Sequence, residues 1–256
     1  MLKFIEQTAR EAGNILMKYY NGENKITRKK DLGYVGEADL ASEKYILDAI
    51  EKSYPSSHII SEEEGELNKE LSGNGMTWII DPLDGTTNFV HRFPFFAVSI
   101  GVMINGELSA GAVYNPASDE LFSAQQGKGA FLNGQKICVS KIREFNDSLC
   151  ITGFYYFQGE KLYHQIERFK RVQEATLSVR RLGAAALDIC YVACGRAEGF
   201  WEEGLNSWDV AAGTLILQES GGIFSDFSGK TGSIFGNEFI YSNNYIQEDL
   251  LKILHL

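Results

Sequence analysis

Cysteine is scarce in this sequence and follows no metal-binding spacing. The 256 residues contain four cysteines and no Cys-x-x-Cys pair, which excludes a zinc site of that spacing and a disulfide-rich secreted fold. We predict four free, buried thiols in a reducing compartment, and therefore a cytoplasmic protein. The residues concerned are Cys138, Cys150, Cys190 and Cys194.

Long hydrophobic runs are also absent from the sequence. The longest one, residues 93–104, is interrupted by Pro94, Ser99 and Gly101 and is well short of the roughly 20 residues that span a bilayer. Near the first residue, Glu6 breaks the apolar stretch that a signal peptide needs. We expect neither a transmembrane helix nor export by that route.

Basic residues are outnumbered by acidic ones. The chain has 24 Lys and Arg against 34 Asp and Glu, a formal net charge of −10. This surplus repels nucleic acid and anionic membranes unless a local patch reverses the sign. The small cluster Arg28, Lys29 and Lys30 is explained by a solvated loop, so we predict neither a nucleic acid nor a membrane as partner. Only four prolines and 44% hydrophobic residues exclude global disorder.

The first 54 residues carry two helical patterns with a patternless segment between them. Apolar residues recur at helical spacing over residues 4–19 and again over residues 37–54. Asp39 lies in the first turn of the second predicted helix. The basic, glycine-containing segment 25–36 shows no periodicity, and we expect a mobile loop there.

The rest of the chain mixes strand and helix patterns. Short apolar runs at residues 58–61 and 78–80 predict strands, and carboxylates follow both. Residues 96–124 carry longer β-rich runs around an Asn-Gly turn, which is typical of an antiparallel meander. Further expected strands lie at 150–152, near 178, at 197–201, after 222 and at 239–242, and further helices at 160–173, 182–195, 209–220 and near the last residues.

These elements predict a layered α+β fold. Residues 1–256 contain no low-complexity linker and no internal repeat, so we expect a single domain. Its N-terminal α+β half is residues 1–145, and its C-terminal α/β half, residues 146–256, is expected to select the substrate.

Two aspartates follow the predicted strand 78–80 directly. Asp81 is expected at the end of that strand, and Asp84 with Gly85 in a turn that leads into a short helix from Thr86. Both carboxylates can then face one point. Backbone N–H groups of Gly85 and Thr86 at the start of the helix favour phosphate binding. A turn and an ordinary helix cap would also explain this motif taken alone.

Two more carboxylates stand in matching positions. Glu62 follows the predicted strand 58–61, and Asp209 stands at the start of a predicted helix. Oxygen ligands of this kind suit Mg²⁺. Glu63 and Glu64 are read instead as a solvated acidic turn. The four histidines show no pairing pattern, so structural or surface roles are expected for His58, His91, His164 and His255.

Five segments then match one known family. WIIDPLDGTTNF at residues 78–89 and WDVAAGTLILQESGG at residues 208–222 are its two signatures, in family order and at a family-like separation. Residues 61–65 (SEEEG), 93–101 (FPFFAVSIG) and 127–135 (GKGAFLNGQ) are also similar to family sequence. Over essentially the whole chain the sequence resembles the inositol monophosphatase family of Mg²⁺-dependent, lithium-sensitive sugar-phosphate phosphatases.

The resemblance has consequences for the fold and for the cofactor. It implies a layered α/β/α/β/α sandwich of the inositol monophosphatase and fructose-1,6-bisphosphatase type, and a homodimer. It also implies two to three Mg²⁺ ions: four carboxylates carry −4 and two Mg²⁺ carry +4, so a phosphate dianion enters with a third ion on the side of Glu62. The implied metal ligands are Glu62, Asp81, Asp84 and Asp209, together with the carbonyl oxygen of Leu83.

The same resemblance implies the catalytic groups. Thr86 matches the threonine that binds the attacking water, Asp39 matches the aspartate that supports this threonine, and Glu62 completes the set. The implied reaction is hydrolysis of a phosphoric monoester by direct attack of a metal-activated water, without a phosphoenzyme. Such a hydrolase needs no histidine or cysteine.

Substrate binding is implied for residues of both halves. Glu202 matches the carboxylate that accepts hydrogen bonds from polyol hydroxyls, and Asp84 and Asp209 can do the same. Gly183 and Ala184 match the lining of the pocket. The expected partner is a small polyol or sugar phosphate, with inositol 1-phosphate as first choice.

The sequence departs from the family pattern in two places. Gly33 and Gly36 stand where members commonly have an aspartate and a threonine, which puts the loop's contribution to a third metal in doubt. Ala184 replaces a usual serine or threonine and removes a hydroxyl from the pocket. Arg180 and Arg181, just before this segment, are candidates for holding a second phosphate.

Several alternatives stay open on the sequence alone. Other substrates of the enzyme class are fructose 1,6-bisphosphate, histidinol phosphate and 3′-phosphoadenosine 5′-phosphate. An alternative of a different class is a non-catalytic regulatory or binding protein on the same fold.

Overall fold

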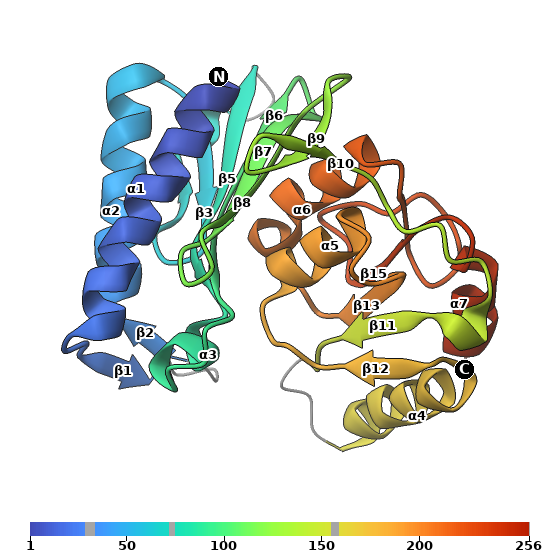
Figure 1. The fold of residues 1–256 in the computed structure, drawn as a ribbon. Coiled ribbons are helices and arrows are strands. Elements are labelled where there is room, and N and C mark those ends of the chain that lie inside the picture. Colours follow the sequence, from blue (N-terminus) through green and yellow to red (C-terminus); the bar gives the residue numbers. More distant parts are fainter. Residues whose placement is uncertain (29–33, 72–74, 155–158, 256) are drawn as a thin grey trace.

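The molecule is built of five layers, in the order helices, sheet, helices, sheet, helices (Figure 1). The computed structural model describes residues 1–28, 34–71, 75–154 and 159–255. An eight-stranded and a five-stranded sheet enclose one pair of helices, and each outer sheet face carries another pair. This confirms the predicted α+β sandwich.

The first outer layer is formed by α1 (Leu2–Asn21) and α2 (Glu37–Ser53), as the helical spacing predicted. The expected loop between them is partly wrong, because β1 (Ile26–Arg28) and β2 (Tyr34–Gly36) form an antiparallel pair. Strands of three residues are too short to show a period of two. Residues 29–33, which include Lys29, Lys30 and Gly33, lie outside the described residues.

The larger sheet contains the predicted meander. Its strand order is β10-β9-β8-β7-β6-β5-β3-β4; β3 and β5 pair in parallel, and all other neighbours are antiparallel. The short strands β4, β9 and β10 were not predicted. The bounds are β3 His58–Ser61, β4 Gly65–Leu67, β5 Met76–Asp84, β6 Ala97–Ile104, β7 Glu107–Asn115, β8 Glu120–Gln125, β9 Gly129–Leu132 and β10 Gln135–Ile137.

Strand β5 carries the aspartate motif and is longer than predicted. Trp78 packs with α1 and α2, whereas Ile79 packs with the helices of the middle layer, as alternation along a strand requires. Asp81 was expected at the end of the strand but lies within it, since pairing with β6 resumes at Asp84 after an irregularity. Pro82, which has no N–H to donate, sits in this irregularity.

The C-terminal half supplies the second sheet and the remaining helices. The strand order is β12-β11-β13-β15-β14, with β11 parallel to both of its neighbours and β15 antiparallel to β13 and β14. The strands are β11 Leu149–Thr152, β12 Ser178–Arg180, β13 Gly199–Glu203, β14 Ile223–Ser225 and β15 Glu238–Ser242; the helices are α4 Glu160–Ala175, α5 Ala185–Ala193, α6 Ser207–Glu219 and α7 Gln247–Leu254. A short helix, α3 (Thr86–Val90), and two 3₁₀ turns (Lys69–Leu71 and Phe145–Asp147) complete the described elements.

Helices α5 and α6 form the middle layer and are almost wholly buried. All but one of the nine residues of α5 are buried between the two sheets. Its alanines have small side chains, which allow the helix to pack closely. Phe95 and Phe96, in the segment that enters β6, are core residues and are not free to form a dimer surface, whereas Phe93 beside them is exposed. Burial was predicted for all four cysteines, and the prediction is correct for Cys150 and Cys190 only: Cys194 is half-buried and Cys138 is exposed.

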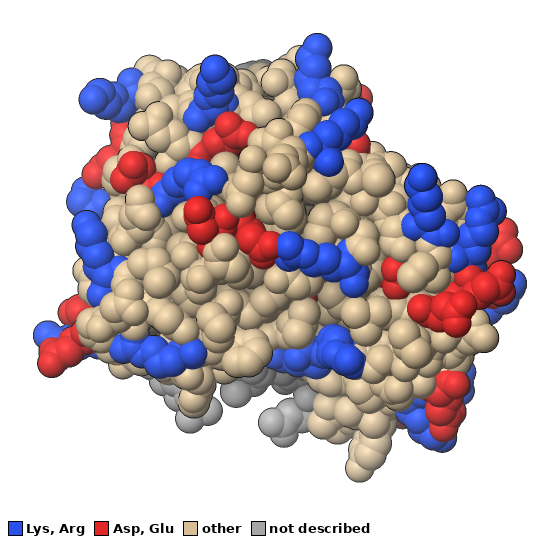
Figure 2. Space-filling model, viewed as in Figure 1, with Lys and Arg blue, Asp and Glu red and all other residues tan. Residues whose placement is uncertain are grey.

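The surface carries its charges in a scattered pattern. On the face shown in Figure 2, Lys and Arg side chains lie among Asp and Glu and do not gather in one basic patch. In the described part of the chain, no helix combines the length and the apolar character required to cross a bilayer.

Candidate active site

Three aspartates from two distant parts of the chain meet at the C-terminal end of strand β5 in the larger sheet. Asp81 and Asp84 lie on β5, and Asp209 lies in the first turn of α6. One carboxylate oxygen from each lies within 4.8 Å of the others, and two of the three side chains are buried. The sequence predicted this convergence, and the structure places the three together.

Each of these carboxylates is fixed by a backbone N–H group. Asp81 Oδ1 accepts from the N–H of Leu83 at 2.9 Å, and Asp209 Oδ2 accepts from Asn206 at 2.7 Å. Asp84 Oδ2 accepts from the N–H of Ala186 in the first turn of α5, at 2.8 Å. The aspartates are therefore held in place by the chain itself.

Crowding of acidic groups makes this site costly in its ionised form. Burial raises the pKa of Asp81 and of Asp84 well above the usual range, and the charges of neighbouring carboxylates raise both further. For Asp209, burial is again the largest cause and raises the pKa to about 7. A bound cation would remove this repulsion, so the site favours positive charge.

Glu62 lies beside the three aspartates but outside their 4.8 Å group. It follows β3, and its N–H donates to the carbonyl of Ile80 on β5 at 3.2 Å. Its charge raises the pKa of Asp81, Asp84 and Asp209. Glu62, the fourth predicted carboxylate, therefore lies close to the three aspartates but not within 4.8 Å of all of them.

Thr86 and Asp39 meet as the resemblance implied. The Thr86 hydroxyl can donate to Leu83 O at 3.1 Å or to Asp39 Oδ1 at 3.4 Å. Asp39 Oδ2 accepts from the N–H of Gly36 at 3.0 Å. Burial raises the pKa of Asp39 to about 7, and the charges of Glu63 and Glu62 contribute to this increase.

Gly85 joins the aspartate motif to the predicted pocket lining. Its φ of +84° is a left-handed conformation. A β-carbon at this position would lie 3.1 Å from Ala184 Cβ and 3.1 Å from Phe95 O. Gly183 and Ala184 are therefore placed directly against the motif, and glycine is required for that approach.

Glu202 on β13 completes the predicted set. The residue is buried, and burial raises its pKa to about 8 together with the charges of Asp209 and Asp84; Arg181 opposes this increase. The two predicted arginines therefore differ in their surroundings. The charge of Arg181 lowers the pKa of Glu202, whereas the Arg180 guanidinium donates to the carbonyl of Val179 at 3.1 Å.

Two buried carboxylates near the site were missed by sequence reasoning. Asp188 on α5 is 1% exposed, and neither of its oxygens has a hydrogen-bond partner among the described residues. A lone aspartate in an otherwise apolar helix was the available signal. Glu43 on α2 accepts from the hydroxyl of Ser61 and from the N–H groups of Glu63 and Glu64. It fixes the turn that carries Glu62, and no motif around Glu43 indicates this role.

Comparisons with known proteins agree with this geometry. A sequence model of the inositol monophosphatase family matches residues 1–255. A relative called Nus factor SuhB, from Pasteurella multocida (strain Pm70), is 39% identical over 254 residues, which cover 98% of this chain and 94% of the relative. The chain belongs to the inositol monophosphatase family.

Two solved structures share the whole architecture. The extragenic suppressor protein suhB from Bartonella henselae superposes with a TM-score of 0.93 at 38% identity, over 99% of this chain and 97% of that one. An inositol monophosphatase from Anabaena (Nostoc) sp. PCC 7120 gives a TM-score of 0.88 at 38% identity, over 99% and 94%. Similarity at this level covers both sheets and all of the layers.

Proposed function

We propose that the protein is a Mg²⁺-dependent phosphomonoesterase that hydrolyses a small polyol or sugar phosphate. The observation that carries the proposal is the meeting of Asp81, Asp84 and Asp209, with carboxylate oxygens within 4.8 Å of one another. Membership of the inositol monophosphatase family supports it.

The donor atoms of the site fit Mg²⁺. Carboxylate oxygens are its preferred protein ligands, and burial together with the charges of neighbouring carboxylates raises the pKa of each aspartate, which supports a cation as the partner of this site. Cations bound there supply positive charge that polarises a phosphoryl oxygen and makes a water molecule more acidic. We assign two to three ions to Asp81, Asp84, Asp209, Glu62 and the Leu83 carbonyl.

The chain's own residues then orient the reactants. The Thr86 hydroxyl donates its hydrogen to Asp39 or to the Leu83 carbonyl, so its lone pairs are left to accept a hydrogen bond from the attacking water. Asp39 acts by fixing the direction of that hydroxyl. We place the phosphate near the N–H groups of Gly85 and Thr86, and we assign Glu62 to the same catalytic group.

The leaving group lies against the second half of the chain. When ionised, the Glu202 carboxylate is an acceptor only, so it can accept hydrogen bonds from the hydroxyls of the leaving group. Asp84 and Asp209 add further acceptors. Gly183 and Ala184 form the wall next to Gly85. We propose inositol 1-phosphate as the substrate, in line with the inositol monophosphatase from Anabaena that shares this fold.

Phosphate release from inositol 1-phosphate tests the function directly. We expect release with Mg²⁺, loss of release in EDTA, and recovery when excess Mg²⁺ is added. A panel with fructose 1,6-bisphosphate, histidinol phosphate and 3′-phosphoadenosine 5′-phosphate then ranks the substrates by kcat/KM. If no phosphate ester is hydrolysed in the presence of Mg²⁺, the proposal is wrong.

One observation favours the bisphosphate alternative. Arg181 is exposed, and its charge acts on both Glu202 and Asp188, so a distal phosphate held by this guanidinium would lie at the polyol end of the pocket. If it does, Arg181→Ala raises KM for fructose 1,6-bisphosphate much more than for inositol 1-phosphate. Equal effects on the two substrates would refute a distal phosphate site.

The second candidate function is a regulatory or binding role, and the name Nus factor of several relatives favours it. The buried acidic cluster argues for catalysis, because buried carboxylates that repel one another destabilise a fold. A protein that serves only as a binding surface gains nothing from them. The EDTA experiment separates the two candidates.

Four further properties stay predictions. We propose one domain over residues 1–256 with halves 1–145 and 146–256, a homodimer, inhibition by millimolar lithium, and a cytoplasmic location without a nucleic-acid partner. Light scattering tests the homodimer. A homodimer has twice the chain mass of 28.6 kDa, whereas a value near 28.6 kDa at micromolar concentration rejects it. Insensitivity to lithium would count against a third ion beside Glu62.

A further inference from the structure

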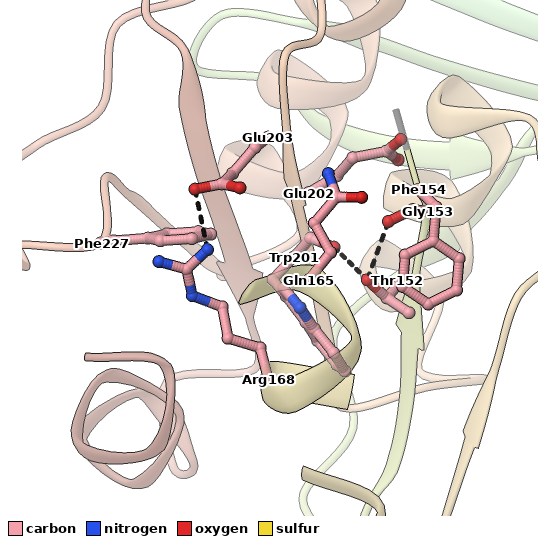
Figure 3. Close-up of a pocket in the computed structure, with 9 residues that line it drawn as sticks. All are labelled: Thr152, Gly153, Phe154, Gln165, Arg168, Trp201, Glu202, Glu203 and Phe227. Atoms are coloured by element: carbon pink, nitrogen blue, oxygen red, sulfur yellow. Dashed lines mark hydrogen bonds and ion pairs between the residues drawn. The ribbon is translucent and has the colours of Figure 1, made fainter. Parts of the chain in front are cut away.

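A small cavity is lined by residues of α4, of β13 and of the end of β11 (Figure 3). Its volume is about 10 Å³, room for one water-sized group. Glu202 belongs to its lining, together with Gln165 of α4 and the backbone of Gly153 after β11. The cavity therefore shares Glu202 with the proposed leaving-group site.

The Gln165 amide has no hydrogen-bond partner in this cavity. The residue is 5% exposed, and neither Nε2 nor Oε1 is paired with any described residue. Figure 3 shows the side chain extending from α4 toward Glu202. Buried amides are nearly always hydrogen-bonded, to protein or to water, so this one has room for a polar partner: a water molecule in the free protein, or a hydroxyl of a ligand that replaces it.

Neighbouring polar groups of the cavity already have partners. The Thr152 hydroxyl donates to the carbonyl of Trp201 at 2.8 Å. Arg168 donates to Glu203 Oε1 at 2.8 Å and to the carbonyl of Leu254 at 3.0 Å. None of these groups is hydrogen-bonded to the Gln165 amide.

Gly153 brings the Glu202 carboxylate to this cavity. A β-carbon on Gly153 would lie 1.9 Å from Glu202 Oε2, so a side chain at this position would displace the carboxylate from its place beside that backbone. A group entering the cavity thus meets an acceptor on Glu202 and an amide on Gln165 that both donates and accepts, whichever way the amide is turned.

We propose that Gln165 is a specificity-determining residue that, with Glu202, binds one hydroxyl of the leaving group. The hydroxyl donates its hydrogen to the Glu202 carboxylate, and its oxygen accepts from the Gln165 amide N–H. The pair selects polyol phosphates over alkyl phosphates of the same ring size. This inference rests on the proposed phosphatase function and deepens it.

The test compares two esters that differ only in hydroxyl groups, inositol 1-phosphate and cyclohexyl phosphate. Gln165→Met keeps the length of the side chain but removes both hydrogen-bonding groups. We expect it to lower kcat/KM for inositol 1-phosphate about tenfold more than for cyclohexyl phosphate, the usual effect of one lost hydrogen bond. Gln165→Glu, which cannot donate when ionised, should show the same selectivity.

A matched control and two outcomes make the test decisive. Gln7 is an exposed glutamine of α1, so Gln7→Met makes the same chemical change away from the site and should leave the ratio of the two kcat/KM values unchanged. If Gln165→Met affects both esters equally, or neither, the proposal is overturned and Gln165 is a structural residue.

Failure of the proposed function would be visible separately. If the wild-type protein hydrolyses neither ester with Mg²⁺, the phosphatase proposal fails, and the subsite is tested by saturation-transfer NMR with free myo-inositol. Weaker binding to the Gln165→Met variant than to wild type would support the subsite. No binding to wild type, or equal binding to both proteins, would overturn it.

Discussion

Three carboxylates of the candidate site also serve as helix caps. Asp39 and Asp209 accept the N–H groups that precede α2 and α6, and Asp84 accepts an N–H in the first turn of α5. Such bonds satisfy donors that a helix leaves unpaired at its start. The positive ends of three helices thereby face the acidic cluster and offset part of its repulsion.

Asp209→Asn tests the metal site at this scale. The amide keeps the shape of the side chain but removes one negative charge from a cluster that we assign to divalent cations. We expect the fold to persist, as seen by circular dichroism, and kcat/KM to fall about a hundredfold or more at fixed Mg²⁺ concentration. Asp48→Asn, on the exposed side of α2, is the control. A near-normal kcat for Asp209→Asn would contradict the assignment.

Thr86→Val tests the water-positioning hydroxyl. Valine has almost the same volume but cannot accept from the water or donate to Asp39. We expect kcat to fall about a hundredfold with little change in KM, because only the reacting geometry is affected. Thr87→Val, at the exposed next residue of α3, should remain close to wild type. A loss that appears mainly in KM would place Thr86 in substrate binding instead.

Sequence reasoning found the residues with recognisable chemistry and missed those without it. Asp81, Asp84 and Asp209 were found because carboxylates followed strand or helix signals, and the structure brings them together. Gln165 and Asp188 were missed, because one polar residue in a helix does not show which way it faces. Their unpaired, buried side chains became evident only with the fold.

At the scale of elements, the turn between β5 and α3 fixes the site. The irregular end of β5 places Asp81 and Asp84 on one side, and Gly85 lets the segment before α5 approach. Asn88 on α3 then donates to the carbonyls of Phe95 and Leu182, each at 2.8 Å. This turn connects the two halves of the molecule.

Gly85→Ala measures the importance of that approach. Gly106, in a hairpin turn, has the same φ of +84° but nothing within 4 Å of its β-carbon position. We expect Gly106→Ala to lower the free energy of unfolding by about 1 kcal/mol for the left-handed backbone alone. Gly85→Ala should lower it by about 2 kcal/mol or more and reduce kcat, because it also displaces Ala184. Equal urea midpoints for the two variants would show that the close contact is unimportant.

The elements that sequence reasoning found were those with a long pattern. Helices α1 and α2 and the meander of β6, β7 and β8 have enough residues to show their period. Strands β1, β2, β9 and β10 have three or four residues each, so their existence depends on the partner strand rather than on local sequence. Strand β5 was cut short at Ile80 because Asp81 and Pro82 normally end strands.

At the scale of the whole molecule, the acidic cluster links stability to pH and to Mg²⁺. The pKa of Asp209 is about 7 in the folded protein against an ordinary 3.8, and that of Glu202 is about 8 against 4.5. Between these values the folded state holds protons that the unfolded chain has released. The stability from each group is thus complete below its ordinary pKa and is lost as pH rises through the folded value.

Thermal unfolding in EDTA should therefore show a lower Tm at about pH 8 than at about pH 5.5, by about 2–4 °C for each kcal/mol lost. Mg²⁺ should raise Tm more at the higher pH, because ligand carboxylates must be ionised to bind it. Asp209→Asn, which removes one of the titrating groups, should reduce both effects. A Tm in EDTA that does not fall over this interval would contradict the raised pKa values.

The hydrogen bond from Ala186 to Asp84 joins residues 102 positions apart, and this separation determines when the acidic site can assemble during synthesis of the chain. At about 5–20 residues per second, the ribosome needs roughly 5–20 s to add the α5 segment after Asp84 has been made, and still longer to add Asp209. During that interval the nascent chain exposes the sheet face that α5 and α6 will cover, and its aspartates have no third partner. A truncated chain released before α6 would therefore lack Asp209, so its acidic site would be incomplete, and its uncovered apolar surface would make it a target for chaperones.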